Sequence, residues 1–240
     1  MWRWLGLPVQ ASAQAPALDR ITVMVHILMV VVFAGWSLYF VFVLARFRRR
    51  RQPAANYHGA RGHWSTWADV GVAAAEVLLL AAFSIPAWAS RANPPAGDAL
   101  IVRVTAQQFS WTIHYPGADG QFGRVDASLA GADNPSGLDR QSAGASDDVI
   151  SVNQMHLPID RAVIVQLTAR DVIHSFGVPA MRVKQDAIPG MMIPVWFTPT
   201  LAGSFDIACS QLCGLGHYRM HGVITVENAR DFTAWLGSQR

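Results

Sequence analysis

The residues best suited to chemistry in this sequence are gathered in one short segment near its C-terminal end. Cys209, Cys213, His217 and Met220 lie within twelve residues of one another and include both cysteines of the chain. A further imidazole, His174, follows an upstream apolar run of β-strand type. Thiolate, thioether and imidazole ligands together suit copper. The five side chains exceed the two His, one Cys and one weak Met of a mononuclear blue-copper centre.

Three kinds of site fit these residues. In an oxidising compartment Cys209 and Cys213 can form a disulfide, which leaves the nearby His217 and Met220 without a role. Two Cys and two His suffice for zinc, but Met is not a zinc ligand and the spacings differ from those of zinc fingers. In the third kind, both thiolates bridge two copper ions, and His174, His217 and Met220 complete the coordination. Covalent c-type haem is excluded, because the sequence contains no Cys-x-x-Cys-His motif.

The segments that must position these ligands are short and rich in Val, Ile, Thr and aromatic residues. Turn signals such as Pro116-Gly117 and Pro189-Gly190 separate them. Many short strands without alternating helices favour an antiparallel sandwich or barrel. The polar stretch 126–148 is expected to be a surface insertion, and 228–236 a short terminal helix. The expected strands are 100–106, 109–115, 149–152, 162–168, 172–178, 192–197, 204–208 and 222–226.

The N-terminal part of the chain is apolar enough to cross a membrane twice. Residues 21–44 carry no formal charge and as a helix would cross a bilayer core of about 30 Å. Residues 70–89 form a second run of about one bilayer length. The connection between the runs contains six Arg, which mark the cytoplasmic side. The sequence therefore predicts a transmembrane hairpin over 21–89 with both termini outside, and an external domain over 90–240.

Two features of the membrane part leave alternatives open. Residues 1–20 form an external segment that resembles a signal peptide in part, although its apolar core is shorter than usual. Glu76 lies inside the second apolar run, where a carboxyl group is costly. Such a group either marks a proton path or stays protonated and hydrogen-bonded against a partner helix.

Composition and charge exclude other classes of protein. The chain has 240 residues, of which 52% are apolar and 15% charged, which argues against wholesale disorder. Residues 1–90 carry a net charge of +5, and residues 91–240 carry −2. The basic excess adjoins the apolar runs, so it indicates membrane topology and not nucleic-acid binding. The acidic external half favours a basic protein partner.

The whole pattern resembles subunit II of the haem–copper cytochrome c oxidases. Two spans followed by a β domain ending in CSQLCGLGHYRM are typical of that family. The segments VIHSFGVPAMRVKQDAIPG (172–190) and CSQLCGLGHYRMHG (209–222) carry the resemblance most specifically. It implies two N-terminal transmembrane α-helices followed by an all-β cupredoxin-like Greek-key barrel with a dinuclear copper A centre.

The resemblance also implies a role for each ligand. Two copper ions would share the thiolates of two cysteines, and each would have one imidazole and one weak donor. The bridging thiolates are Cys209 and Cys213, the imidazoles are His174 and His217, and the weak donors are Met220 and the backbone carbonyl of Gln211.

Three positions differ from the commonest pattern of that family. Gln211 stands where a Glu usually reaches a magnesium ion shared with subunit I, and it lacks the charge, which argues against magnesium here. Phe109 stands where a Trp usually receives electrons, with Trp111 nearby, so electron uptake is expected at one of these two. Glu76 is the candidate for the carboxyl that usually feeds a proton channel, although its spacing from Pro86 differs.

The implied function is electron uptake by a respiratory cytochrome c oxidase. Electrons would come from cytochrome c or a similar donor and pass to haem in subunit I, where oxygen is reduced and protons are pumped. The chain would be an enzyme subunit of the inner (plasma) membrane, embedded in lipid, with its C-terminal domain on the periplasmic or external side. Two alternatives are the copper A subunit of a nitric oxide reductase and a membrane-anchored copper carrier.

Overall fold

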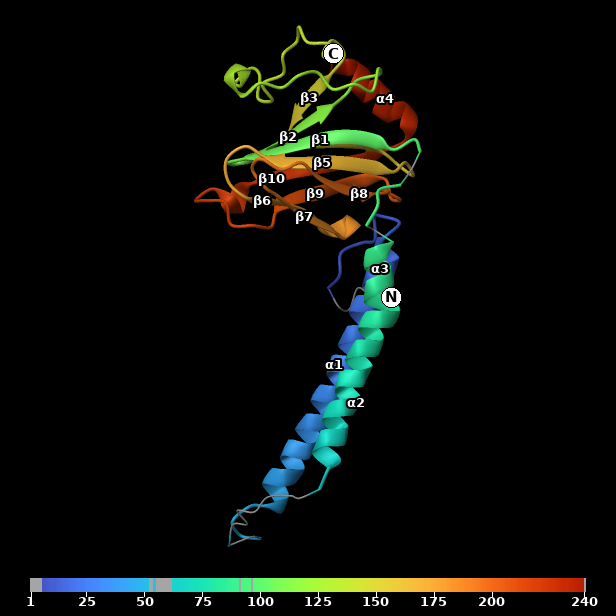
Figure 1. Cartoon of the computed structure of the whole chain (residues 1–240), viewed down its shortest axis with the longest axis vertical. Coiled ribbons are helices and arrows are strands. Elements are labelled where there is room, and N and C mark those ends of the chain that lie inside the picture. The colour runs from blue at the N-terminus through green and yellow to red at the C-terminus, as the bar shows by residue number, and fades with distance from the viewer. Residues whose placement is uncertain (1–5, 52–53, 55–61, 91, 96, 240) are drawn as a thin grey trace. The chain divides into compact units, whose positions relative to one another are not determined.

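The computed structural model describes residues 6–51, 54, 62–90, 92–95 and 97–239. The chain divides into two compact units, Met1–Pro16 with Pro94–Arg240, and Ala17–Asn93. The first unit is built mainly of strands and the second of helices (Figure 1).

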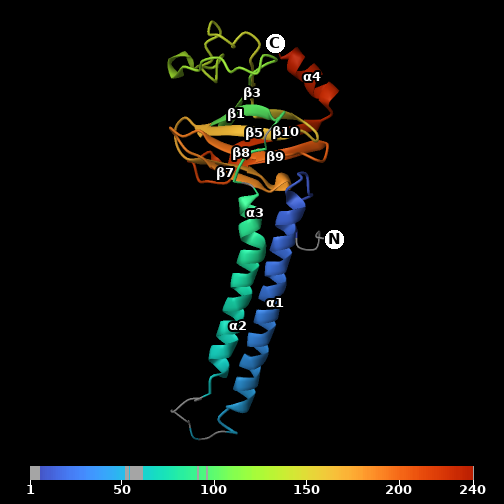
Figure 2. The same cartoon turned by 45° about the vertical axis from the view of Figure 1, so that its right-hand side comes forward.

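The helical unit is a hairpin of two antiparallel arms (Figure 2). Its first arm begins before the apolar run at residue 21. Pro16 lies in the first turn, where the backbone N–H groups have no partner within the helix, so the N–H that proline lacks is not needed. Its second arm begins before residue 70 and contains a π-helical segment. Pro86 follows that segment and cannot donate to the carbonyl four residues back, which explains the local change of helix type. The elements are α1 (Ala15–Arg46), α2 (Trp64–Leu79), the π-helix Leu80–Ser84 and α3 (Ile85–Ala89).

Both arms are long and apolar enough to span a bilayer. Large apolar side chains such as Phe33, Leu38 and Phe40 are exposed in the isolated chain. An apolar surface of this extent is unusual for a protein in water, so it fits a membrane-anchored protein. Glu76 lies on α2 with an exposed side chain, and its role in a proton path stays a prediction.

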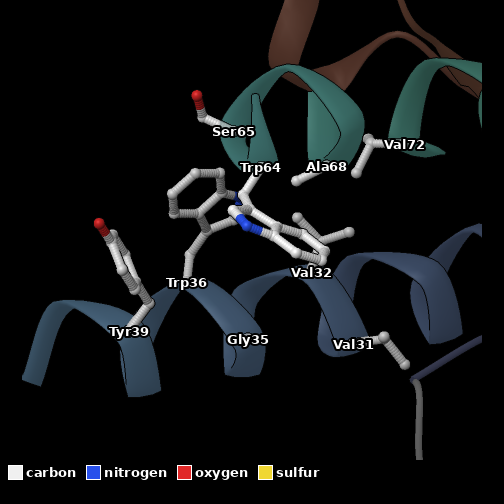
Figure 3. Close-up of a pocket in the computed structure, with 9 residues that line it drawn as sticks. All are labelled: Val31, Val32, Gly35, Trp36, Tyr39, Trp64, Ser65, Ala68 and Val72. Carbon is white, nitrogen blue, oxygen red and sulfur yellow. The ribbon is translucent and has the colours of Figure 1, made fainter. Parts of the chain in front are cut away.

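An apolar pocket of about 540 Å³ lies between α1 and α2. Trp36 from α1 and Trp64 from α2 both point into the space between the helices (Figure 3). Gly35 and Ala68 also line it, and no charged side chain does. The lining therefore suits apolar groups, such as lipid tails or side chains of a neighbouring helix, and offers no chemistry for a metal.

The β unit is a sandwich of two five-stranded sheets, with the cupredoxin-like fold that the sequence predicts (Figure 1). The strand orders are β3-β2-β1-β5-β8 and β4-β10-β9-β6-β7. The pairs β1/β5 and β10/β4 are parallel, so the sheets are mixed and not antiparallel throughout. The strands are β1 (Leu100–Gln107), β2 (Ser110–Tyr115), β3 (Val149–Val152), β4 (Gln154–Pro158), β5 (Val163–Ala169), β6 (His174–Val178), β7 (Val183–Ala187), β8 (Ile193–Phe197), β9 (Gly203–Cys209) and β10 (His221–Glu227).

The core lies between the two sheets. Buried and partly exposed residues alternate along β1 and β5, the period-two pattern of strands with one face inward. Val104 and Leu167 have no exposed surface, and neither do the larger side chains of Trp111 and Phe176. The centroids of these two rings are 5.6 Å apart, and the rings meet edge to face. Phe176 lies on β6 two residues after His174, so the packed core extends to the end of the sandwich that carries His174.

The strands β4 and β7 are additional to those expected from the sequence. β7 contains the polar residues Lys184, Gln185 and Asp186, so its sequence lacks the apolar pattern from which strands are predicted. β4 follows β3 after Asn153 alone, at which the chain passes from one sheet to the other with a φ of 59°. The side-chain oxygen of Asn153 accepts a hydrogen bond from the amide of Trp111, 2.8 Å away, which fixes this change of sheet.

The insertion between β2 and β3 contains a single short 3₁₀ turn, Ala127–Leu129, among its described elements, as its polar composition predicts. A buried contact anchors it: Nε2 of His114 lies 2.6 Å from Oδ2 of Asp148. The amide of Gly123 donates to the same oxygen at 2.8 Å. Burial lowers the pKa of His114, against the effect of the neighbouring carboxylate, so the neutral imidazole is favoured there.

The segment before α1 is part of the β unit. The amide of Ala11 donates to the carbonyl of Ala180 at 2.9 Å, and the amide of Thr200 donates to the carbonyl of Ala11 at 2.9 Å. The hydroxyl of Ser12 donates to the carbonyl of Met181 at 2.7 Å. Ala11 and Ser12 are buried. Part of the external segment expected over residues 1–20 is therefore bound to the β unit by backbone hydrogen bonds at Ala11. Residues 1–5 lie outside the described part of the chain.

Candidate metal centre

The expected ligands come together at one end of the sandwich. His174 is the first residue of β6, and Cys209 is the last residue of β9. These two strands pair, which brings the segment before Phe176 alongside Cys209. The loop from β9 to β10 then supplies the remaining side chains, with His217 as the first residue of a 3₁₀ turn (His217–Arg219) and Met220 directly after it. Neighbouring strands thus place residues that are far apart in sequence at one edge.

Cys213 lies at the middle of the cluster. Its sulfur is 3.8 Å from the sulfur of Cys209, 3.6 Å from Nδ1 of His217 and 3.8 Å from the sulfur of Met220. Nδ1 of His174 lies 4.0 Å from the sulfur of Cys209. The donor atoms of His174, Cys209 and Cys213 all lie within 4.8 Å of one another. Three side chains, those of His174, His217 and Met220, therefore surround the two sulfurs closely enough to share metal ions with them.

The two cysteines are free thiols. Their sulfurs are too far apart for a disulfide, whose S–S bond is about 2.05 Å long. They are close enough for one metal ion to contact both, since metal–thiolate bonds are about 2.3 Å. Burial, with a contribution from Cys209, raises the pKa of Cys213 to about 11, so a metal must displace the proton of this thiol when it binds.

The weak donors flank different thiols. The backbone carbonyl of Gln211 lies 3.1 Å from the sulfur of Cys209, whereas the thioether of Met220 faces Cys213. Met220 is buried, and the side chain of Gln211 is exposed. The donor set therefore combines two thiols, two imidazoles, a thioether and a carbonyl. This soft set fits copper far better than magnesium or calcium, which prefer oxygen ligands.

Two residues outside the expected ligand set hold this cluster. One carboxylate oxygen of Asp171 lies 2.8 Å from Nε2 of His174. The backbone amide of Gln108 donates to the other oxygen at 2.7 Å, and its side chain donates to the carbonyl of Cys213 at 2.6 Å. The spacing of Asp171, three residues before His174, is the signal in the sequence that points to the first of these contacts.

The structure separates the two aromatic residues expected at the point of electron uptake. Trp111 has no exposed surface, and its indole lies 6.3 Å from the ring of His174, edge to face. Trp111 therefore presents no surface to a donor, since every residue from Trp111 to Tyr115 is buried, and its place in electron uptake stays a prediction. Phe109 is partly exposed, packs against the ligand loop at Gly216, and lies beneath the guanidinium of Arg219. Its role in electron uptake stays a prediction.

A family model described as the periplasmic domain of cytochrome c oxidase subunit II matches residues 100–227, which include every proposed ligand. The chain belongs to the cytochrome c oxidase subunit II family. The alternative cytochrome c oxidase subunit 2 of Bradyrhizobium diazoefficiens is 36% identical over 212 residues, covering 87% of this chain and 75% of the relative. Cytochrome c oxidase subunit 2 of Cereibacter sphaeroides is 31% identical, covering 98% of this chain and 80% of the relative.

A solved structure is also similar to this subunit II chain. It is the periplasmic domain of subunit II of cytochrome oxidase from Bradyrhizobium japonicum, 31% identical, with a TM-score of 0.46. The similarity covers 61% of this chain and 96% of that structure. The relatives of this subunit II chain are named as parts of an oxidoreductase, so the expected family and enzyme class are confirmed.

Proposed function

We propose that this chain is the electron-accepting subunit of a respiratory cytochrome c oxidase. Its β unit would hold two copper ions, receive electrons singly from cytochrome c or a similar donor, and pass them to haem in subunit I. The observation that carries this proposal is the position of Cys213. Its sulfur lies within 3.8 Å of a second thiol, an imidazole and a thioether.

We assign the ligands from these contacts. The thiolates of Cys209 and Cys213 lie between the two imidazoles, so they are the groups that two ions can share. Copper held there would supply a one-electron store spread over both ions. The chain supplies the rest: it sets His174 and Cys209 on the ends of paired strands and the other ligands on the loop between β9 and β10, which would limit their movement when an electron arrives. The ligand set is His174, Cys209, Cys213, His217, Met220 and the carbonyl of Gln211.

The ring of Phe109 is the proposed point of contact with the donor. It is partly exposed and packs on the loop between Cys213 and His217, so a donor that touched this ring would be next to the ligand loop. The apolar hairpin would anchor the subunit in lipid of the inner membrane, with the β unit on the periplasmic side. Contact with the haem-containing subunit I is part of the same proposal.

Two further roles follow from the resemblance of the chain to its family. Glu76 is the proposed carboxyl of a proton path, since it is an ionisable group within an apolar helix. Gln211 carries an uncharged side chain, so we propose that its carbonyl binds copper and that no magnesium is held there by a carboxylate of this residue. Replacement of Gln211 by Glu would then create the missing charge.

Copper content of the full chain, purified in detergent, tests the proposed site. We expect two copper ions per chain and, in the half-reduced form, one unpaired electron that interacts with both copper nuclei in the electron paramagnetic resonance spectrum. The matched control is the double variant Cys209→Ser with Cys213→Ser, which should show neither. A single zinc ion without colour would contradict the proposal, and a single exchangeable Cu(I) would indicate a copper carrier.

Purification of the complex from its native membrane tests the wider role. We expect a haem-containing partner and consumption of oxygen with reduced cytochrome c as the donor. Consumption of nitric oxide, and not of oxygen, would show that the subunit belongs to a reductase of that gas.

A further inference from the structure

The carboxylate of Asp171 forms a hydrogen bond with one of the proposed copper ligands, His174. Its Oδ1 lies 2.8 Å from Nε2 of His174 and accepts from the amide of Val172 at 2.7 Å. Its Oδ2 accepts from the amide of Gln108 at 2.7 Å. Both oxygens of this carboxylate therefore act as acceptors of backbone N–H groups from two different segments.

This contact determines which nitrogen of His174 is free. Oδ1 accepts from the amide of Val172, and in the same role it accepts from Nε2 of His174, so Nε2 carries the proton. Nδ1 then has its lone pair available, and it is the nitrogen that faces the sulfur of Cys209 at 4.0 Å. The imidazole has no exposed side-chain surface, so bulk water does not compete for this nitrogen.

Gln108 extends the same contact to the opposite side of the cluster. Its backbone amide holds Asp171, and its side-chain Nε2 donates to the carbonyl of Cys213 at 2.6 Å. One residue, in the turn between β1 and β2, therefore joins the segment that carries His174 to the loop that carries Cys213. A carbon added at Gly214 would meet the Gln108 amide, which shows how closely this turn fits the loop.

We propose that Asp171 and Gln108 are positioning residues of the copper centre: Asp171 fixes the tautomer and orientation of His174, and Gln108 couples that carboxylate to the loop of Cys213. This inference rests on the proposed function. Carboxylates that orient a metal-bound imidazole typically change metal affinity or activity by about 10- to 100-fold when removed. They also increase the donor strength of the imidazole, which favours the oxidised metal.

Two variants test the role of Asp171 in the full chain loaded with copper in detergent. Asp171→Ala removes the acceptor, and Asp171→Asn keeps the size of the side chain but removes its charge and presents an N–H to the amide of Gln108. We expect both to lose copper to a chelator about 10- to 100-fold faster than the wild type. We also expect a higher reduction potential and a changed hyperfine pattern, with the Asn variant intermediate.

Asp206→Asn is the matched control for charge. Asp206 lies on β9, three residues before Cys209, and pairs with His221 at the surface without contacting a proposed ligand. Its replacement removes one nearby carboxylate but no hydrogen bond to a proposed copper ligand. Gln108→Glu tests the second residue, because it turns the donor to the Cys213 carbonyl into an acceptor. Gln107→Glu is its control, since Gln107 accepts a hydrogen bond from Arg170 and a carboxylate can do the same.

The outcomes separate this inference from the proposed function. If the wild type fails to hold two coupled copper ions, both are wrong. If the wild type holds them and the Asp171 variants match Asp206→Asn in release rate, potential and spectrum, the role of Asp171 is refuted. Should Asp171→Ala fail to fold, the Asn variant of equal size decides, and equal behaviour of Gln108→Glu and Gln107→Glu would refute the role of Gln108.

Discussion

The ring of Phe109 covers Gly216 so closely that a Cβ at this glycine would overlap three of the ring carbons. Phe109 follows Gln108 in the turn between β1 and β2, and Gly216 immediately precedes His217 in the ligand loop. The aromatic ring and the absence of a side chain at position 216 are therefore complementary. This packing limits the positions that the loop of Cys213 and His217 can take.

Gly216→Ala should loosen the ligand loop. Overpacking of this kind costs about 1–3 kcal/mol of unfolding free energy, because either the ring or the loop must move. We expect a lower thermal midpoint and faster copper loss, and we expect the added change Phe109→Ala to restore part of both. Gly237→Ala on the terminal helix α4 (Ala229–Ser238) is the control, since nothing lies within 4 Å of a Cβ there. An unchanged copper-loss rate in Gly216→Ala would contradict the proposed packing role.

Cys213→Ser should abolish the coupled copper pair. A hydroxyl at this position cannot serve as a soft bridging ligand, and it leaves His217 and Met220 without their common neighbour. The half-reduced spectrum should then show an electron confined to one ion or no copper signal. Ser210→Ala, which keeps both thiols, should behave as wild type. Two equivalent copper ions in Cys213→Ser would show that this sulfur is not shared.

Met220→Leu should change the reduction potential more than the stability. Leu and Met have similar volumes, so their exchange in a buried position usually costs less than about 1.5 kcal/mol. Loss of a weak donor in a drier site disfavours the more highly charged state, so we expect the potential to rise. The control is Met192→Leu, because Met192 is 51% exposed and outside the proposed ligand set. Equal potentials in the two variants would argue against ligation by Met220.

The unfolding free energy of the β unit should fall as the pH is lowered through the ordinary pKa of histidine, about 6.5. Burial lowers the pKa of His114 in the folded state, so the unfolded state binds the proton first and gains stability at acidic pH. The groups around His114 are Asp148, Arg103 and Arg140. One such group gives a slope of at most about 1.4 kcal/mol per pH unit.

His114→Gln should reduce this dependence on pH. The pH dependence is measured from the thermal midpoint of the full chain in detergent, followed by near-ultraviolet circular dichroism. The pH is varied from about 5 to about 8, a range that brackets the ordinary pKa of histidine. His221→Gln serves as the control, because His221 is an exposed residue on β10. An identical pH profile for His114→Gln and the wild type would show that the buried contact with Asp148 is not the cause.

Most of the fold follows from local patterns in the sequence, and the exceptions have identifiable causes. Runs of β-branched residues locate β1 and β5, whose buried faces alternate regularly. β7 escapes because its polar residues resemble a loop, and its strand state depends on pairing with β6. The parallel pairing of β1 with β5 depends on contacts across sixty-three positions, which no local pattern contains.

The ligands of the candidate site can be predicted from the sequence, whereas most of the residues that hold those ligands in place cannot. Cys209, Cys213, His217 and Met220 are close in sequence, so their clustering can be read directly. Gln108 meets Cys213 across 105 positions, and only the three-dimensional fold brings them together. Trp111 lies two residues after Phe109, which suggests a shared role, yet its side chain has no exposed surface, and the local sequence does not show this.

The hydrogen bonds between Ala11 and both Ala180 and Thr200 have a consequence for topology. Residues joined in this way must occupy the same aqueous compartment. Whatever lies between positions 13 and 94 must therefore cross a bilayer an even number of times, independently of any rule about charged loops. The count of two apolar arms satisfies this parity, and a chain with one arm deleted could not keep both its membrane anchor and these bonds.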